Sequence, residues 1–196
     1  MAEQNKRLVV GVSGASGSLL ALDLLRQMKS LPHWETHVVI TASAQRTLRH
    51  EIPDAPDCLE QLADYIYEPE DIGAKIASGS FSTDGMVVVP CSTKTAAGIN
   101  SGYSDNLLLR AADVTIKEHR PLVLCVRESP LSTIHLRNML ELSRMGVTIL
   151  PPMMTFYNRP NTIEEMVRHH TGRILCLFGE EAEGYMRWNG GQETRI

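Results

Sequence analysis

LVVGVSGASG, residues 8–17, joins an apolar run rich in β-branched side chains to a loop of glycine, serine and alanine. Leucine and methionine side chains then recur at four-residue intervals, which is the spacing of one helix face. We therefore predict a strand over Leu8–Val12, a tight loop, and a helix over Ser18–Leu31. Glycine lets the backbone approach a ligand closely, and a helix N-terminus favours an anion. The loop is accordingly predicted to bind a phosphate, although such a loop can also be only a turn.

The spacing of the glycines narrows the kind of ligand. They follow G-x-x-G-x-x-G from Gly11, not the dinucleotide pattern G-x-G-x-x-G, and no Gly-Lys-Ser/Thr of a P-loop follows. The second predicted strand, Thr36–Thr41, ends in hydroxyl side chains, whereas dinucleotide-binding proteins place a carboxylate there for the ribose. The pattern therefore favours a ligand with its own phosphate, such as FMN, over NAD.

The rest of the chain alternates strand and helix patterns. Further strands are predicted over Met86–Val89, which Pro90 closes, Leu122–Val126 and Val147–Leu150. Further helices are predicted over Ala44–Glu51, over a short segment ending near Tyr65, over Glu70–Ala77, after the loop Cys91–Thr95, after caps at Asp105 and Ser132, and over Ile163–Phe178 behind a Thr162–Glu165 capping box.

Repeated strand–helix units with apolar strands place the chain in the α/β class. We predict a single domain over residues 1–180, a Rossmann-like or flavodoxin-like doubly wound parallel sheet with helices on both faces. Residues 181–196 are expected to form a C-terminal tail that packs in an oligomer or is partly disordered. Ligands of such sheets bind at the carboxyl ends of the strands, so we expect the site there.

Composition excludes several classes of function. A net charge of −4 without a basic run gives no reason to expect nucleic acid. No apolar segment resembles a signal peptide or reaches the length of a membrane span, so no membrane partner is expected. The four cysteines lack C-x-x-C spacing and are predicted to be buried free thiols in the reducing cytoplasm. The histidines lack ligand spacing, so no metal is expected.

Several motifs in register along the chain resemble one family. They are GVSGASG (11–17), SGSF (78–81), PCSTKT (90–95), RAADV (110–114), KExRPLVL (117–124), RESPL (127–131) and PPxxxFYxRP (151–160). Together they resemble the UbiX-like flavin prenyltransferases, which include the B subunits of hydroxyarylic acid decarboxylase systems. The resemblance covers about Lys6 to Phe178, nearly the whole chain.

The resemblance implies a transfer reaction. Family members join the dimethylallyl group of dimethylallyl phosphate to N5 and C6 of reduced FMN without a metal. The prenylated FMN then matures in a separate UbiD-type decarboxylase. The resemblance also implies a homo-oligomer, since dodecamers with sites between subunits recur in the family.

Site residues follow from the same resemblance. FMN would be held by Gly14, Ala15, Ser16, Thr41, Ser92, Thr93, Lys94, Thr95 and Arg127. Dimethylallyl phosphate would be bound by Tyr157, Arg173 and Lys117, with Arg110 and Ser78 joining from the same or a neighbouring subunit. Glu128 is assigned to proton transfer at the flavin nitrogen. The other catalytic candidates are Glu51, Lys117 and Ser16.

Each of these residues also has an ordinary structural explanation. Lys117 suits the dipole at a helix end, and Glu128 is a common turn residue. Tyr157 could be a packing residue, and Arg173 could pair with a surface carboxylate. The pair His169-His170 is expected at the surface, because adjacent helical residues point in different directions. Cys91 is expected to be an inert buried thiol, and Trp188 to pack in an oligomer or be disordered.

Two other functions stay open at this point. One is an FMN-dependent cysteine-type decarboxylase of the same fold, whose Pro-Ala-Ser-Ala-Asn-Thr motif is replaced here by Pro-Cys-Ser-Thr-Lys-Thr. The other is a non-catalytic flavin-binding subunit of an aromatic acid decarboxylase. The presence of Lys117, Glu128, Tyr157 and Arg173 argues against that reading.

Overall fold

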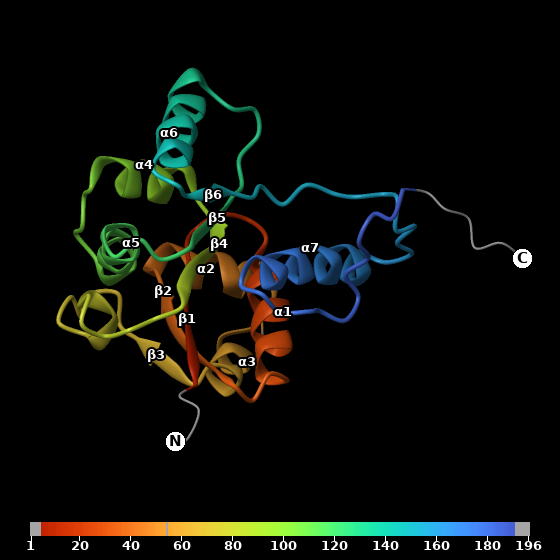
Figure 1. The fold of residues 1–196 in the computed structure, drawn as a ribbon, viewed down its shortest axis with the longest axis horizontal. Helices are drawn as coiled ribbons and strands as arrows, with labels where there is room; N and C mark the ends of the chain where they lie inside the picture. Colours follow the sequence, from red (N-terminus) through yellow and green to blue (C-terminus); the bar gives the residue numbers. More distant parts are fainter. Residues whose placement is uncertain (1–4, 54, 191–196) are drawn as a thin grey trace, which may run out of the picture.

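The centre of the computed structural model, which describes residues 5–53 and 55–190, is a parallel sheet. Its six strands lie in the order β3-β2-β1-β4-β5-β6 (Figure 1). Their bounds are Lys6–Val12 (β1), Trp34–Ile40 (β2), Tyr65–Tyr67 (β3), Gly85–Cys91 (β4), Leu122–Val126 (β5) and Thr148–Ile149 (β6). The strand order turns back at β1, which confirms the predicted doubly wound α/β fold.

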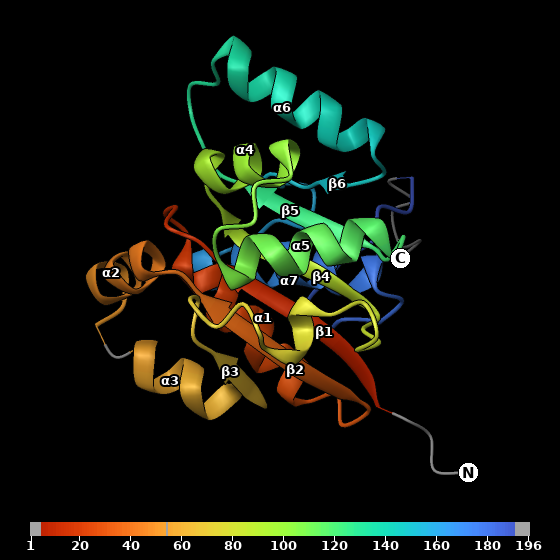
Figure 2. The same ribbon diagram turned by 90° about the vertical axis from the view of Figure 1, so that its left-hand side faces the viewer.

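Helices cover both faces of this sheet. Their bounds are Ser18–Lys29 (α1), Ala42–Glu51 (α2), Ala55–Leu62 (α3), Lys75–Ala77 (η1, a short 3₁₀ helix), Thr93–Ser101 (α4), Leu107–Lys117 (α5), Thr133–Arg144 (α6) and Ile163–Leu177 (α7). Apolar residues of α1, α2, α3 and α7 form one core cluster, and those of η1, α4, α5 and α6 form another. Figure 2 looks onto the α4 and α5 side, with α1 and α7 behind the strands.

Strand β1 shows how the sequence produces two cores. Leu8, Val10 and Val12 belong to the first cluster, while Val9 belongs to the second, because successive side chains point to opposite faces. All four are at most 1% exposed. Burying each such side chain contributes roughly 1.5–3 kcal/mol. The unbroken apolar run was therefore the correct signal for a central strand covered on both sides.

Two predicted helices differ from the structure. The short helix expected to end near Tyr65 stops at Leu62, and Tyr65–Tyr67 forms the edge strand β3, which pairs with β2. The helix expected over Glu70–Ala77 is reduced to η1. A three-residue strand is too short to show an alternating pattern, so its pairing with β2 could not be seen in the sequence.

Strand ends and helix caps agree more closely. β4 continues through Pro90 to Cys91, and its register against β5 is irregular between Val88 and Cys91. Proline is tolerated at such an irregularity because its missing N–H is not needed there. Ser132 and Thr162 cap α6 and α7 as predicted. The cap of α5 is Asn106 instead of the expected Asp105.

The C-terminal segment after α7 packs against that helix in the same chain. The Tyr185 ring lies 5.0 Å from the His169 ring, and a Cβ atom on Gly172 would come within 2.7 Å of Tyr185. The last six residues of the predicted tail, 191–196, lie outside the described residues. None of the helices in the described ranges is long and apolar enough to cross a membrane.

Candidate functional site

The glycine loop between β1 and α1 has a backbone that other residues could not easily adopt. Gly17, the N-cap of α1, has φ of 115°, in the region that favours glycine. A Cβ atom on Gly14 would lie 2.5 Å from the Ser43 hydroxyl oxygen, so α2 begins directly against the loop. Thr41 caps α2 by accepting from Ala44 N, and its hydroxyl lies 3.1 Å from that of Ser43. The loop and the end of β2 therefore form one surface.

Glu51 at the end of α2 reaches back to the N-terminus of α1. Its carboxylate accepts hydrogen bonds from Gly17 N at 3.1 and 3.2 Å and from Ser18 N at 2.8 Å. Burial by itself would raise the pKa of Glu51, but hydrogen bonds from Ser16, Ser18 and Gly17 outweigh it and lower the pKa. Glu51 is thus ionised at neutral pH and already occupies two N–H groups that an anion could use. A phosphate at this loop has to use other donors.

Those donors lie where β4 ends. The Ser13 hydroxyl donates to Pro90 O at 3.0 Å and accepts from Ser92 N at 2.8 Å, which joins the ends of β1 and β4. Ser92 also caps α4 by accepting from Thr95 N. The first turn of α4 presents Thr93 and the exposed Lys94. Hydroxyl groups, helix N–H groups and a cation therefore meet beside the glycine loop.

The end of β5 completes this edge of the sheet. Arg127 N donates to Cys91 O at 2.9 Å, and Glu128 follows with an exposed side chain that accepts from Ser129 N at 3.0 Å. That local bond is typical of a turn residue, and the carboxylate lies beside the carboxyl end of β5. The structure brings together Gly14, Ala15, Ser16, Thr41, Glu51, Ser92, Thr93, Lys94, Thr95, Arg127 and Glu128. We call this group the carboxyl-edge set.

Cys91 lies beneath that set but is not placed to react. Its side chain is fully buried, and burial raises the pKa of its thiol to about 12, with only partial compensation from a backbone hydrogen bond at Ala96. A thiol that stays protonated at neutral pH is a poor nucleophile. The buried, inert reading of Cys91 agrees with this environment.

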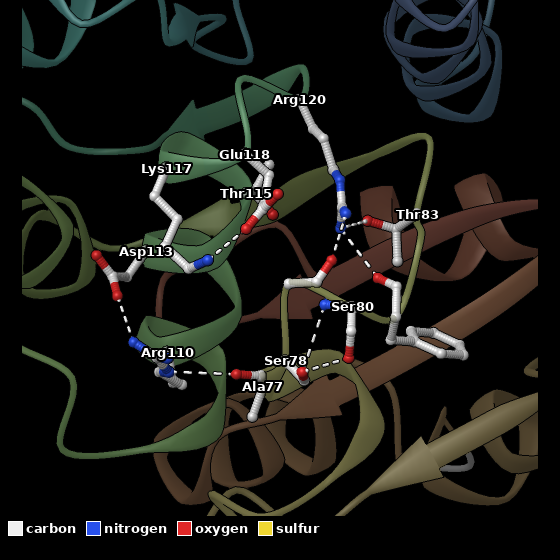
Figure 3. Close-up of polar contacts among 12 residues, drawn as sticks. Ala77, Ser78, Ser80, Thr83, Arg110, Asp113, Thr115, Lys117, Glu118 and Arg120 are labelled. Atoms are coloured by element: carbon white, nitrogen blue, oxygen red, sulfur yellow. Dashed lines mark hydrogen bonds and ion pairs between the residues drawn. The ribbon is translucent and has the colours of Figure 1, made fainter.

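A second group of predicted residues gathers on α5. Arg110 Nε donates to Ala77 O at 3.3 Å, and Arg110 pairs with Asp113. A Cβ atom on Gly79 would lie 2.7 Å from Lys117 Nζ, which forms an ion pair with Glu118. Figure 3 shows Arg110 and Lys117 on α5 facing the loop that carries Ser78. We call Ser78, Arg110 and Lys117 the α5 set.

The α5 set and the carboxyl-edge set lie at opposite ends of the strands: the α5 set at their amino ends and the carboxyl-edge set at their carboxyl ends. The loop of Ser78 leads into Gly85, where β4 begins, and Lys117 shortly precedes Leu122, where β5 begins. The seven residues of β4 separate this edge from Ser92, which corresponds to about 20 Å of strand. Within one chain, therefore, the two sets do not form a common site.

Tyr157 lies on the segment after β6, and Arg173 lies on α7. The Tyr157 hydroxyl donates to Met186 O at 3.0 Å and lies 3.2 Å from His169 Nε2. Burial raises the pKa of Tyr157 and Tyr185 adds to this, while the nearby charge of Arg173 opposes it. Tyr157 also meets the Trp188 ring edge-on at 5.7 Å, so this tryptophan packs within its own chain.

Three residues outside the predicted site set organise these groups. Ser13 in the glycine loop and Ser43 after the second predicted strand stand where hydroxyl groups were expected, but their contacts cross between strands, so no local pattern showed their partners. The surface prediction for the histidine pair was wrong for His169, which is 4% exposed, and His170 is half-buried. Burial is the larger cause and the neighbouring His169 the smaller one that together lower the pKa of His170 to about 4. The three-residue spacing of His169 and Gly172 on α7 was the signal available for burial.

Comparison with known proteins gives consistent matches. The family model described as Flavoprotein matches residues 1–174. A probable UbiX-like flavin prenyltransferase of Sedimentibacter hydroxybenzoicus is 48% identical over 187 residues, which are 95% of this chain and 99% of that protein.

Two solved structures agree closely with the fold. A dodecameric FMN-dependent UbiX-like decarboxylase from Escherichia coli O157:H7 has a TM-score of 0.92 and 50% identity, covering 94% of this chain and all of the other. AnUbiX (PadA1) in complex with FMN and dimethylallyl pyrophosphate has a TM-score of 0.92 and 45% identity, covering 95% and 98% of the two chains.

Proposed function

This chain belongs to the Flavoprotein family and, within it, to the UbiX-like flavin prenyltransferases, and we propose from that membership how its own residues act. The enzyme transfers the dimethylallyl group of an allylic phosphate ester to N5 and C6 of reduced FMN, giving prenylated FMN. The observation that carries this assignment is the carboxyl-edge set, where the hydroxyl of Ser13 ties the glycine loop to the PCSTKT motif.

The carboxyl-edge set fits a flavin mononucleotide. Gly14 lets the loop pack directly against Ser43 at the start of α2, and the start of α4 offers hydroxyl and N–H groups for a phosphate. Lys94 and Arg127 add positive charge beside them. We propose that Gly14, Ala15, Ser16, Thr41, Ser92, Thr93, Lys94, Thr95 and Arg127 hold FMN. Reduced FMN supplies the nucleophilic atoms of the reaction when it is bound.

Protein cations stabilise the leaving phosphate in this proposal. Tyr157 and Arg173 bind the phosphate group, with Arg able to make a bidentate contact. Lys117, Arg110 and Ser78 add positive charge and a hydroxyl. Charge that grows on the phosphate as the allylic bond breaks is stabilised by such preorganised groups. One phosphate group needs fewer cations than a diphosphate, so the transfer proceeds without a metal.

Two carboxylates handle protons in the proposed reaction. Glu128 lies at the exposed end of β5 and moves a proton at the flavin nitrogen. Glu51 is held in its ionised form against the glycine loop, where it can accept a proton beside Ser16. The hydrogen bonds from Gly17 and Ser18 fix the direction of the Glu51 carboxylate.

The complete site is proposed to form between subunits. The α5 set lies too far from the glycine loop of its own chain, so Lys117 can act only by facing a neighbouring subunit's carboxyl-edge set. The dodecameric state of the Escherichia coli relative supports this arrangement. Large exposed apolar side chains also support assembly, notably Ile134 at 60%, Met153 at 71% and Phe156 at 67% exposure.

The product is proposed to serve a separate UbiD-type decarboxylase, since prenylated FMN is made for use elsewhere.

The reaction needs a reduced flavin, and all four cysteines are free thiols. Both features support a reducing compartment such as the cytoplasm.

The assignment is tested by incubating the purified protein with reduced FMN and dimethylallyl phosphate under anaerobic conditions. The expected result is a flavin heavier by one prenyl unit, formed equally well with magnesium or with a chelator. Recovery of unchanged flavin would contradict the transfer and favour a non-catalytic flavin-binding subunit. Release of carbon dioxide from a cysteine-terminated peptide, tested in parallel, would favour the cysteine-type decarboxylase.

A further inference from the structure

His169 is a buried polar residue that contacts the proposed substrate-binding tyrosine. It lies on α7, and its Nε2 atom is 3.2 Å from the Tyr157 hydroxyl and 3.2 Å from Met186 O. Its Nδ1 atom is 3.1 Å from the Thr155 hydroxyl. The Tyr157 and His169 rings meet edge-on, with centroids 5.5 Å apart. Both ring nitrogens therefore have polar contacts, and the His169 ring packs against the rings of Tyr157 and Tyr185.

The direction of these hydrogen bonds follows from which atoms carry hydrogen. Met186 O is a carbonyl and can only accept, so the Tyr157 hydroxyl donates to it at 3.0 Å. For the same reason, a bond from His169 Nε2 to Met186 O requires hydrogen on Nε2. Once the phenol has used its single hydrogen, its oxygen can only accept. The single hydrogen on His169 Nε2 is thus shared between Met186 O and the Tyr157 oxygen, each 3.2 Å away.

We propose that His169 is a positioning residue for Tyr157 in the prenyl transfer, which rests on the proposed substrate-binding role of Tyr157. His169 Nε2 and Met186 O lie on the same side of the phenol oxygen, 3.2 and 3.0 Å from it, and together they hold the Tyr157 side chain in one orientation. When dimethylallyl phosphate binds, the phenolic hydrogen turns from Met186 O to a phosphate oxygen, and the hydrogen bond from His169 Nε2–H keeps the phenol oxygen in place. A hydroxyl that accepts one hydrogen bond donates a stronger one, so the hydrogen bond from His169 strengthens the one from Tyr157 to the phosphate.

Substitutions that keep or remove the Nε2 hydrogen test this proposal. His169→Leu fills the space without a donor, whereas His169→Gln places an amide N–H near the same position. The measurement is calorimetric titration of dimethylallyl phosphate into protein loaded with oxidised FMN. Because the transfer needs reduced FMN, this titration measures binding of the ester without turnover. We expect His169→Leu to weaken binding about tenfold, the size of one hydrogen bond at the site, and His169→Gln to recover most of it. FMN affinity should stay unchanged.

A double-mutant cycle separates positioning from general packing. In a Tyr157→Phe background there is no hydroxyl to orient, so His169→Leu should cause no further loss of dimethylallyl phosphate affinity. His170→Leu is the matched control, because His170 is the neighbouring histidine on α7 and its Nε2 has no hydrogen-bond partner among the described residues. It should bind the ester like the wild type.

Three outcomes would overturn the proposal. The first is wild-type affinity of His169→Leu for the ester. The second is an equal loss in the presence and absence of the Tyr157 hydroxyl, which indicates a packing role. The third is wild-type affinity of Tyr157→Phe, which also removes Tyr157 from the proposed function. If His169→Leu does not fold, the His169→Gln variant decides, since failure to match the wild type within about threefold contradicts the donor role.

Discussion

At the scale of single residues, the proposed mechanism requires Glu128 to transfer a proton at the flavin nitrogen. Its side chain is exposed and bonds only to the adjacent Ser129 N among the described residues, so its removal should not disturb the fold. Glu128→Gln keeps a similar shape and loses the ability to transfer a proton. We expect FMN affinity to be unchanged and turnover to fall by roughly 10²–10⁴-fold, the range for a lost general acid or base. Fluorescence titration and a single-turnover assay measure the two effects, and unchanged turnover would remove Glu128 from the mechanism.

Glu51 links the same edge of the sheet to the stability of the fold. Its pKa is lowered from the ordinary value of 4.5 in the folded protein, so its stabilising effect is present above that value and is lost as pH falls through the folded-state pKa. We expect Glu51→Gln to lower the free energy of unfolding by about 1 kcal/mol at pH 7, a size that allows for solvent screening of an exposed carboxylate. Urea unfolding at several pH values should show this difference shrinking toward pH 4 and below. A difference that stays constant with pH would contradict the assigned role of the charge.

The sequence predicted single residues well where the chemistry is local. Ser132 and Thr162 cap helices because their hydroxyls bond to N–H groups three residues later, and that preference can be read from the residues themselves. The partners of Ser13, which are Pro90 and Ser92, could not be found this way, since they are remote in sequence. His169 was misplaced at the surface because its burial depends on the segment around Met186 and Tyr185, which no periodic pattern marks.

At the scale of secondary structure, long periodic elements were predictable and short edge elements were not. The apolar run of β1 and the regular leucines of α1 determine their own structure, so both were found with nearly correct bounds. β3 is a strand only because β2 lies beside it, and of the helix expected over Glu70–Ala77 only Lys75–Ala77 is helical. The β4–α4 junction needed the structure too, because Pro90 lies inside the strand there.

The contact between α1 and α7 gives a prediction about stability. Asp23 of α1 is 7% exposed and accepts hydrogen bonds from Gln27 at 2.7 Å and from the fully buried Thr171 of α7. Thr171→Val removes the hydroxyl and leaves the buried carboxylate with one donor fewer. We expect a loss of about 1–3 kcal/mol in the free energy of unfolding. Thr171→Ser is the matched control, and an equal loss for both variants in urea unfolding would show that packing, not the hydroxyl, matters.

At the scale of the whole molecule, the proposed catalytic groups of the chain lie at the two opposite ends of the strands of one sheet. The sequence motifs identified both groups, but only the strand order shows that Lys117 lies near the amino ends of β4 and β5 while Ser92 lies at the carboxyl end of β4. Periodicity within one chain carries no information about which subunit surface faces which. The assembly was therefore expected only from the family resemblance, and the dodecameric relative supports it.

A site divided in this way can be restored by mixing two inactive variants. Lys117→Ala damages only the α5 set, and Glu128→Gln damages only the carboxyl-edge set. In a mixed oligomer, some sites combine an intact Lys117 surface from one subunit with an intact Glu128 from its neighbour. A mixture of Lys117→Ala with Arg110→Ala is the matched control, because both substitutions damage the same surface and leave no site intact.

The most direct measurement of the central claim is prenylated FMN formation by such mixed oligomers, made by co-expressing the two variants with different affinity tags and purifying through both. We predict that each variant alone is nearly inactive, that the Lys117→Ala and Glu128→Gln mixture regains a clear fraction of wild-type activity, and that the control mixture does not. A mixed oligomer no more active than its parents would contradict a site shared between subunits.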